Sequence, residues 1–202
     1  MRCILPVLAY HVVCSTYGFW LPNDPRGSNS REVRADNIKP FGPATLVTHT
    51  RRSVANQPHE REARTAAKRA LTYPPVTLNG HQALSVARGF ETQIAKSGYR
   101  VFACCILPQH VHLVIGRHNY PIEQVVRLLK QAATAQLVAD GRHPFVRNSD
   151  GKLPSAWGQD FRKVFLFKPD EVFDRIRYVE SNPEKEGKRR QRWPFVIPYI
   201  NS

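Results

Sequence analysis

The chain has 202 residues, and its 30 Lys and Arg against 16 Asp and Glu give a formal net charge of +14. This length supports one domain with a substantial core, and the excess of basic residues favours a polyanionic partner, most often nucleic acid. No apolar run is long enough for a membrane span, and the four cysteines are too few and too irregularly spaced for a disulfide framework. We therefore expect no membrane partner and predict a cytoplasmic protein with reduced thiols.

The first third of the chain predicts a strand, a long irregular segment and a helix. Residues 7–17 are rich in Val, Tyr and Thr, which is typical of a buried strand. Residues 24–56 show no clear periodicity. A helix is predicted from Pro58 to Leu71, because alanines recur on one side of it and basic residues occupy its other faces.

Three further helices are predicted from their boundary residues. Asn79 is the expected N-cap of a helix that Gly98 ends. Pro121 opens the next helix, and Asp170 begins the last one. We expect that last helix to end before the Asn-Pro pair at 182–183, because the residue before a proline disfavours the helical conformation.

Strands alternate with these helices, which predicts an α/β protein. Residues 99–106 and 161–167 have the composition of strands. The triplet Leu107-Pro108-Gln109 predicts either a tight turn or a kink. A further strand follows at 110–117.

Two histidines stand one residue apart in the strand at 110–117. Side chains of a strand alternate between its faces, so His110 and His112 point the same way from neighbouring positions. Two imidazoles placed like this can share one metal ion. An apolar strand offers no packing reason for two polar rings on one face, and the pair therefore predicts a metal site.

The last predicted helix carries a second polar cluster. Its apolar stripe consists of Val172, Phe173, Ile176 and Val179. At about 100° per residue, Tyr178 lies roughly 150° from the centre of that stripe. Asn182 is four residues later and Arg175 three residues earlier, so all three are expected on one exposed side of the helix. Taken alone, this pattern is also typical of an ordinary surface tyrosine.

Two segments carry a resemblance to a known family. They are LPQHVHLV at 107–114 and YVESNPEKEG at 178–187. In this order and at this separation, the two motifs resemble those of the HUH single-tyrosine transposases, and in particular the REP-associated tyrosine transposases. Residues 157–167 and 9–13 also look like segments of that family, and the resemblance covers roughly residues 7–17 and 81–195.

The resemblance implies a fold. It predicts a single domain over residues 1–202 with the ferredoxin-like fold of HUH nucleases, an α/β (α+β) fold. A central antiparallel sheet would carry the histidines, with the tyrosine helix packed beside it. Residues 18–78 are not part of the family's minimal core and are expected to form an insertion.

The resemblance also implies a reaction and its residues. In this family a tyrosine hydroxyl cuts single-stranded DNA, leaving a 5′-phosphotyrosine and a free 3′-OH through which ends can be rejoined. The resemblance assigns the nucleophile to Tyr178 and a divalent metal, Mg²⁺ or Mn²⁺, to His110 and His112. Asn182, four positions after the tyrosine, would be the third ligand. Because tyrosine has a pKa of about 10, a Lewis acid at the phosphate is needed for attack at neutral pH.

The expected partner is single-stranded DNA, with a hairpin or a repeat end as the substrate. The candidates for contacts to its backbone are Arg175, Lys185, Lys188 and Arg189. Some relatives are dimers that pair one subunit's histidines with the other's tyrosine, and others act as monomers. A homodimer therefore stays open at this point.

Two other functions are consistent with the same residues. A domesticated protein could keep the fold and bind DNA repeats without cutting them. A zinc hydrolase or a structural zinc site would need a cysteine near the histidines. If residues 107–109 turn the chain into a hairpin, Cys105 could approach His112.

Overall fold

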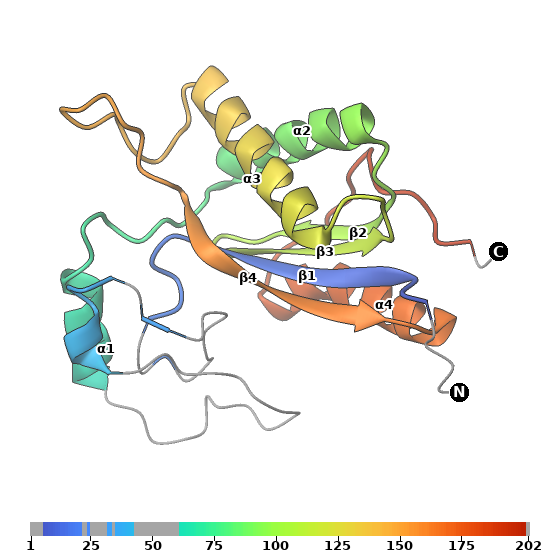
Figure 1. Ribbon diagram of the computed structural model, residues 1–202, viewed down its shortest axis with the longest axis horizontal. Helices are drawn as coiled ribbons and strands as arrows, with labels where there is room; N and C mark the ends of the chain where they lie inside the picture. Colours follow the sequence, from blue (N-terminus) through green and yellow to red (C-terminus); the bar gives the residue numbers. More distant parts are fainter. Residues whose placement is uncertain (1–5, 22–23, 25–31, 34, 43–60, 201–202) are drawn as a thin grey trace.

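The computed structural model describes residues 6–21, 24, 32–33, 35–42 and 61–200. Within these residues the strands are β1 (Ala9–Thr16), β2 (Val101–Ile106), β3 (His110–Gly116) and β4 (Trp157–Leu166). They form one four-stranded sheet, antiparallel throughout, in the order β2-β3-β1-β4 (Figure 1). The two strands in the middle of the sheet are β3 and β1, so the predicted histidine strand is a central one.

The described helices are α1 (Arg61–Arg69), α2 (Gly80–Ser97), α3 (Ile122–Ala139) and α4 (Pro169–Lys185), with a short 3-10 helix η1 (Lys39–Phe41). Helices α2, α3 and α4 cover the two faces of the sheet, whereas α1 and η1 pack together in the segment between β1 and α2. Helices α2 and α3 lie on one face and α4 lies on the other (Figure 1). The succession β1-α2-β2-β3-α3-β4 with this strand order is the ferredoxin-like arrangement. The predicted α/β fold with a central antiparallel sheet is confirmed.

The two faces of the sheet enclose separate apolar cores because strand side chains alternate. Under α2 and α3 the buried side chains include Val12, Phe90, Leu113 and Leu129. Under α4 they include Ala103, Val114, Leu166, Val172 and Val179. The histidines of β3 belong to the second face, which places them under α4.

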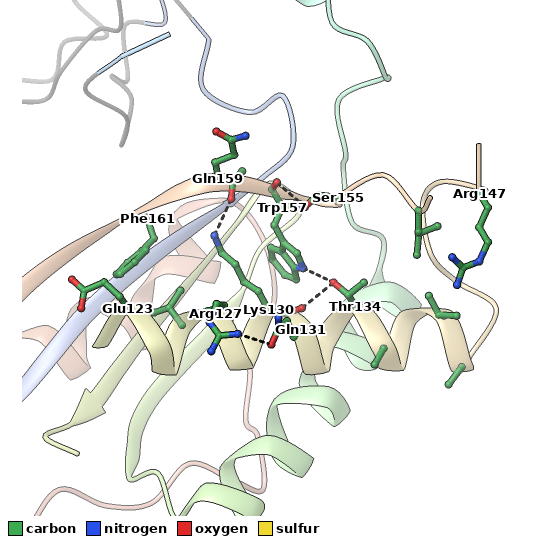
Figure 2. A pocket seen from close by; sticks show the side chains of 16 residues that line it. Glu123, Arg127, Lys130, Gln131, Thr134, Arg147, Ser155, Trp157, Gln159 and Phe161 are labelled. Carbon is green, nitrogen blue, oxygen red and sulfur yellow. Dashed lines mark hydrogen bonds between the residues drawn. The ribbon is translucent and has the colours of Figure 1, made fainter. Parts of the chain in front are cut away.

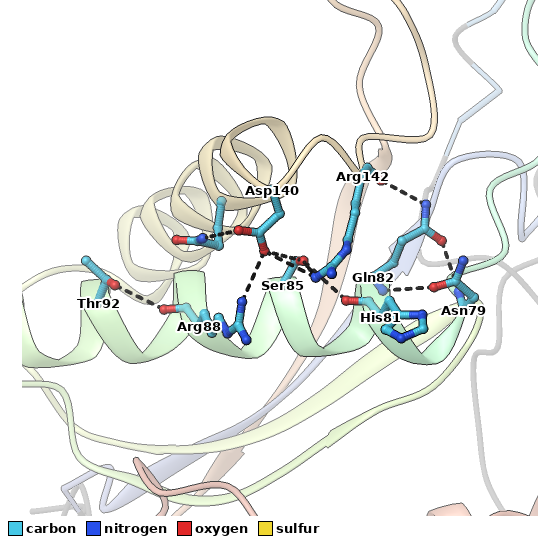
Figure 3. Close-up of polar contacts among 9 residues, drawn as sticks. Asn79, His81, Gln82, Ser85, Arg88, Thr92, Asp140 and Arg142 are labelled. Atoms are coloured by element: carbon cyan, nitrogen blue, oxygen red, sulfur yellow. Dashed lines mark hydrogen bonds and ion pairs between the residues drawn. The ribbon is translucent and has the colours of Figure 1, made fainter.

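Helix α2 begins and ends where its sequence predicts. The Asn79 side chain accepts a hydrogen bond from the Gln82 backbone N–H at 2.9 Å, and the Gln82 side chain accepts one from the Asn79 N–H at 3.0 Å. Gly98 has a φ of 67°, a left-handed conformation that closes the helix. The predicted caps are confirmed, and Figure 3 shows the first of them.

A polar network joins the end of α3 to α2. The Ser85 hydroxyl donates to Asp140 at 2.5 Å, and the Gln136 amide donates to the same carboxylate at 2.8 Å (Figure 3). Arg88 and Arg142 each lie 3.6 Å from that carboxylate. The Ser85 and Gln136 hydrogen bonds hold the pKa of Asp140 below its ordinary value. The network fixes the crossing of the two helices at their polar end.

At the apolar part of this crossing, we expect Gly89→Ala to destabilise the protein by about 1–3 kcal/mol through overpacking. A Cβ on Gly89 would lie 2.6 Å from the carbonyl oxygen of Ala132 and 2.7 Å from the Cα of Ala133, both backbone atoms of α3. The better helix propensity of alanine offsets only part of this cost. Gly80→Ala is the matched control, because a Cβ there meets nothing within 4 Å. Equal urea midpoints for the two variants would contradict the prediction.

The segment between β1 and α2 is described only in part. The predicted helix from Pro58 to Leu71 is observed as Arg61–Arg69, and residues 58–60 lie outside the described residues. The fully buried Ala67 of α1 packs with Leu21 and Ile38. Much of the predicted insertion at 18–78 lies outside the described residues, so the insertion and the single-domain organisation stay predictions.

The end of α4 differs from its prediction. We expected the helix to stop before Asn182, but it runs to Lys185 with Pro183 inside it. Asn182 and Pro183 are both buried, so packing against the sheet outweighs the local preference of the residue before a proline. The Glu186 N–H donates to the Asn182 and Pro183 carbonyls at 3.3 and 3.1 Å, which closes the last turn. No described helix has both the length and the apolar character that crossing a membrane requires.

Candidate active site

The two histidines of β3 face the tyrosine helix. Val13 and Ser15 of β1 are the register partners of His112 and His110, so all four side chains project to the face that α4 covers. The two imidazole rings have centroids 4.9 Å apart. His112 is 5% exposed, whereas His110 is half-buried at the end of its strand.

Tyr178 of α4 lies directly beside His112. The ring centroids of the two residues are 5.8 Å apart, with an edge-to-face angle of 74°. The Arg175 guanidinium lies 5.4 Å from the centre of the Tyr178 ring, and the Lys185 ammonium lies 4.8 Å from it. The phenol is 38% exposed. Residues far apart in the sequence thus bring a phenol, two imidazoles and two cations together.

Tyr178 lies closer to the sheet than the helix pattern predicted. That pattern counted Phe173 in the apolar stripe, but Phe173 is 40% exposed. The helix instead buries Val172, Val179, Asn182 and Pro183. At about 100° per residue, the centre of this buried stripe is roughly 100° from Tyr178 rather than 150°. The tyrosine therefore sits at the edge of the packed face.

The expectation that Asn182 shares the exposed side with Tyr178 and Arg175 is wrong. Asn182 is 9% exposed and its side chain forms a hydrogen bond with Cys105 of β2. It falls three residues after the buried Val179, so it lies on the flank of the stripe that packs on the sheet. The amide is near the tyrosine in sequence but points into the interface between α4 and β2.

His11 of β1 belongs to the site, although the sequence analysis did not single it out. Its Nε2 lies 3.0 Å from Nδ1 of His112, and the two rings are nearly coplanar, with centroids 5.3 Å apart and only 6° between their planes. Its ring centroid is also 5.8 Å from that of Tyr178. The sequence held a weaker signal for His11, because it is a single histidine inside an apolar strand, whereas His110 and His112 form a pair on one face.

Glu186 is a second residue that the sequence analysis missed. One of its carboxylate oxygens lies 3.6 Å from Nε2 of His110. It is the C-cap of α4, where the chain leaves the helix. No motif in the sequence distinguishes this glutamate from its neighbours, and only the length of α4 brings it to the histidine.

Burial keeps the inner two imidazoles neutral. It lowers the pKa of His112 to about 2, helped by the neighbouring His110 and His11 and by Arg175 and Arg162. Burial likewise lowers the pKa of His11 to about 3, again with Arg175 and Arg162 contributing. A neutral imidazole has a lone pair to give to a cation. At neutral pH the site therefore offers uncharged nitrogen ligands surrounded by positive side chains.

The hairpin between β2 and β3 tests the zinc alternative. Residues 107–109 do turn the chain, and Cys105 is the register partner of His112. Burial raises the pKa of the Cys105 thiol to about 12, so it stays protonated at neutral pH. Among the described residues, no group of three or more His, Cys, Asp or Glu side chains could hold a metal ion together. These residues do not form the three- or four-ligand set of a zinc centre.

A site for Mg²⁺ or Mn²⁺ has different requirements. These ions keep several waters and accept few protein ligands. His110 and His112 fit as neutral donors on one face, and Glu186 adds a negative charge beside His110. The Asn182 amide N–H donates to Cys105, which is the register partner of His112, so the amide oxygen is not used by this contact. The chain therefore provides two histidine nitrogens on one face and an amide oxygen on the helix beside them.

The four basic residues predicted to contact DNA divide into two pairs. Arg175 and Lys185 lie against the Tyr178 ring. Lys188 and Arg189 are exposed in the segment that follows α4. The first pair is part of the site itself, and the second extends the positive surface away from it.

A separate hollow lies on the opposite face of the sheet, between α3 and the start of β4 (Figure 2). It has a volume of about 820 Å³. At its wall, the Lys130 ammonium donates to the Gly158 carbonyl at 2.8 Å and the Trp157 indole donates to Thr134 at 3.1 Å (Figure 2). The sheet separates this hollow from Tyr178, so it does not contribute to the candidate active site.

Comparisons with known proteins give several distant structural similarities, among them two transposases. No family model and no curated protein matches the sequence. One similar structure is a REP-associated tyrosine transposase bound to a REP hairpin, with 11% identity, a TM-score of 0.48 and coverage of 93% of this chain and 73% of that one. Another is a candidate transposase from Deinococcus radiodurans, with 14% identity, a TM-score of 0.37 and coverage of 90% and 95%.

Proposed function

We propose that this chain cuts and rejoins single-stranded DNA, with Tyr178 as the nucleophile and a divalent cation, Mg²⁺ or Mn²⁺, held by His110 and His112. One observation carries the proposal. The packing of α4 on the sheet brings the ring centroid of Tyr178 to 5.8 Å from that of His112, with two cationic side chains against the phenol ring. A purely structural role for Tyr178 would not explain why two buried, neutral imidazoles lie beside its ring.

The chemistry assigns a task to each group. A cation at His110 and His112 would supply Lewis-acid chemistry at the scissile phosphate. Arg175 and Lys185, which lie against the Tyr178 ring, attract the phosphate that the tyrosine attacks. The Tyr178 oxygen bonds to phosphorus as the bond to the 3′ oxygen breaks, which leaves a 5′-phosphotyrosine and a free 3′-OH. Attack by the 3′-OH of another strand reverses the step and restores the tyrosine.

The proposed substrate follows from charge and from the sequence resemblance. The net charge of +14 favours a polyanion, and Lys188 and Arg189 extend the positive surface beyond the site. We propose that the DNA is single-stranded and carries a hairpin or a repeat end. His112 and Tyr178 meet within one chain, so the proposal needs no residue from a second subunit.

We propose Asn182 as the third ligand of the cation. As third ligand, Asn182 would use its amide oxygen, while its amide N–H keeps the hydrogen bond to Cys105. All three ligands would then be uncharged, so they would leave the full charge of the cation to act on the phosphate. Its position in the last turn of α4 also couples the cation to the helix that carries Tyr178.

The experiment that tests the function is capture of the covalent intermediate. The protein is incubated with Mn²⁺ and end-labelled single-stranded hairpin DNA from the flanks of its own gene. We expect an adduct that survives SDS, that EDTA prevents, and whose tryptic peptide carries the nucleotide on Tyr178. An adduct on another residue, or one that forms in EDTA, would overturn the assignment. Tight binding without cleavage in any metal would instead identify a DNA-repeat-binding protein, and co-purified zinc would identify a zinc site.

A further inference from the structure

We infer that His11 is a positioning residue, whose Nε2 accepts a hydrogen bond from Nδ1–H of His112 and so keeps Nε2 of His112 free to bind a cation. The inference rests on the proposed function, because it assigns a role toward the cation that His112 would hold. His11 itself is not proposed as a ligand or as a catalytic residue.

The contact between the two rings decides the tautomer of both. Nε2 of His11 and Nδ1 of His112 are 3.0 Å apart, which is the distance of a hydrogen bond. A neutral imidazole carries one proton, on one of its two nitrogens. Between these two nitrogens one must therefore donate and the other accept. The direction of this hydrogen bond therefore also determines whether the other nitrogen of His112, Nε2, carries a proton or a free lone pair.

Cation binding is compatible with only one of the two directions. Nε2 lies on the far side of the imidazole from Nδ1, so it is the nitrogen of His112 that faces away from His11. It can bind a cation only when it carries no proton, and the proton of His112 then sits on Nδ1. A metal-binding histidine usually donates its other N–H to a carboxylate or a carbonyl oxygen. Here the partner at that position is the imidazole of His11.

The surroundings of His11 hold its ring in this orientation. The residue is 4% exposed on the central strand β1, opposite Val114 on one side and Val164 on the other. Its plane is parallel to that of His112 within 6°, and the Tyr178 ring packs edge-on against it at 5.8 Å. His11 therefore touches both the proposed ligand and the proposed nucleophile, and it can align one with the other.

A purely structural role explains His11 poorly. Its Nδ1 is buried and has no hydrogen-bond partner among the described residues. An apolar side chain of similar size would fill the same space without burying an unpaired polar atom. Buried polar atoms without partners are rare in folded proteins and call for a reason. When Nε2 of His11 accepts from His112, the proton of His11 lies on this Nδ1, so the unpaired N–H is the cost of keeping an acceptor nitrogen toward His112.

Two variants separate the hydrogen bond from the shape of the ring. His11→Phe keeps an aromatic ring against His112 and Tyr178 but has no acceptor. His11→Gln places an amide oxygen near the position of Nε2. We expect His11→Phe to weaken Mn²⁺ binding 10- to 100-fold, as loss of a ligand's outer partner does, and His11→Gln to restore it to within about threefold of the wild type. Mn²⁺ affinity is measured without DNA, by calorimetry or by electron paramagnetic resonance.

A spectroscopic measurement on the wild-type protein keeps the inference testable if a variant fails to fold. Long-range ¹H–¹⁵N spectra of the ¹⁵N-histidine protein, with His112 assigned, report which nitrogen carries the proton. We expect Nδ1 protonated on His112, both without metal and in a complex with diamagnetic Mg²⁺. A proton on Nε2 in both states, or equal Mn²⁺ affinities for wild type and His11→Phe, would overturn the inference. If Mn²⁺ affinity depends on His11 but the protein never forms a DNA adduct, the proposed function is wrong and the inference about His11 stands.

Discussion

Tyr178→Phe is expected to abolish the covalent adduct and to lower metal-dependent cleavage by a factor on the order of 10⁴ or more, as removal of a nucleophile does in other enzymes. The substitution removes only the hydroxyl. The phenyl ring keeps the edge contacts to His11 and His112 and the two cations that lie over its face. Folding and DNA binding should therefore match those of the wild type, and the loss is confined to the chemical step.

The control for this variant is another tyrosine beside a histidine. Tyr120 is 44% exposed and packs edge-on against His118 at 4.9 Å. Tyr120→Phe should form the adduct at the wild-type rate under the same conditions, with labelled hairpin DNA and Mn²⁺. An adduct that persists in Tyr178→Phe would show that another residue is the nucleophile, even if its yield is low.

The second large effect is a loss of stability in weak acid. His11 and His112 have pKa values lowered to about 3 and about 2 in the folded protein, against 6.5 in the unfolded chain. The unfolded chain therefore binds more protons than the folded one over this range, so stability falls as the pH falls below 6.5. Each histidine is expected to cost about 2 kcal/mol between pH 7 and pH 5. Together they remove a large share of the stability of an ordinary domain.

Urea unfolding of the metal-free protein at pH 7 and pH 5 measures this effect. His11→Phe removes one of the two buried groups and should lose about half of the pH dependence. His81→Gln, at an exposed position of α2, is the matched control and should keep all of it. Asp140, whose pKa lies below its ordinary value of 3.8, titrates below this window and does not interfere. A wild-type stability that stays constant between the two pH values would contradict the prediction.

Features that depend on neighbouring residues were predictable. The alternation of side chains along β3 was enough to place His110 and His112 on one face. The capping residues Asn79 and Gly98 located both ends of α2, because a cap acts on the backbone within one turn. The succession of strands and helices was enough for an α/β fold.

The predictions were wrong where packing against residues far away in the sequence outweighed a local conformational preference. Asn182 and Pro183 look like a helix stop, yet burial against the sheet carries α4 through them to Lys185. Phe173 looks like a core residue by its spacing, yet it is 40% exposed, and this shifted the predicted face of the helix. In both cases the local pattern followed from the residue types, but burial depended on how the helix is oriented on the sheet, which the pattern does not contain.

The sequence alone, through its charge and two short motifs, was sufficient to predict that two histidines and a tyrosine belong to one site. It could not show how that unit is assembled. The hydrogen bond between His11 and His112 depends on the register between β1 and β3, and the contact between His112 and Tyr178 depends on the packing of α4. Both join residues far apart in the chain, and no periodicity within one segment encodes such a distance. Only the folded sheet and the helix on it bring these rings together.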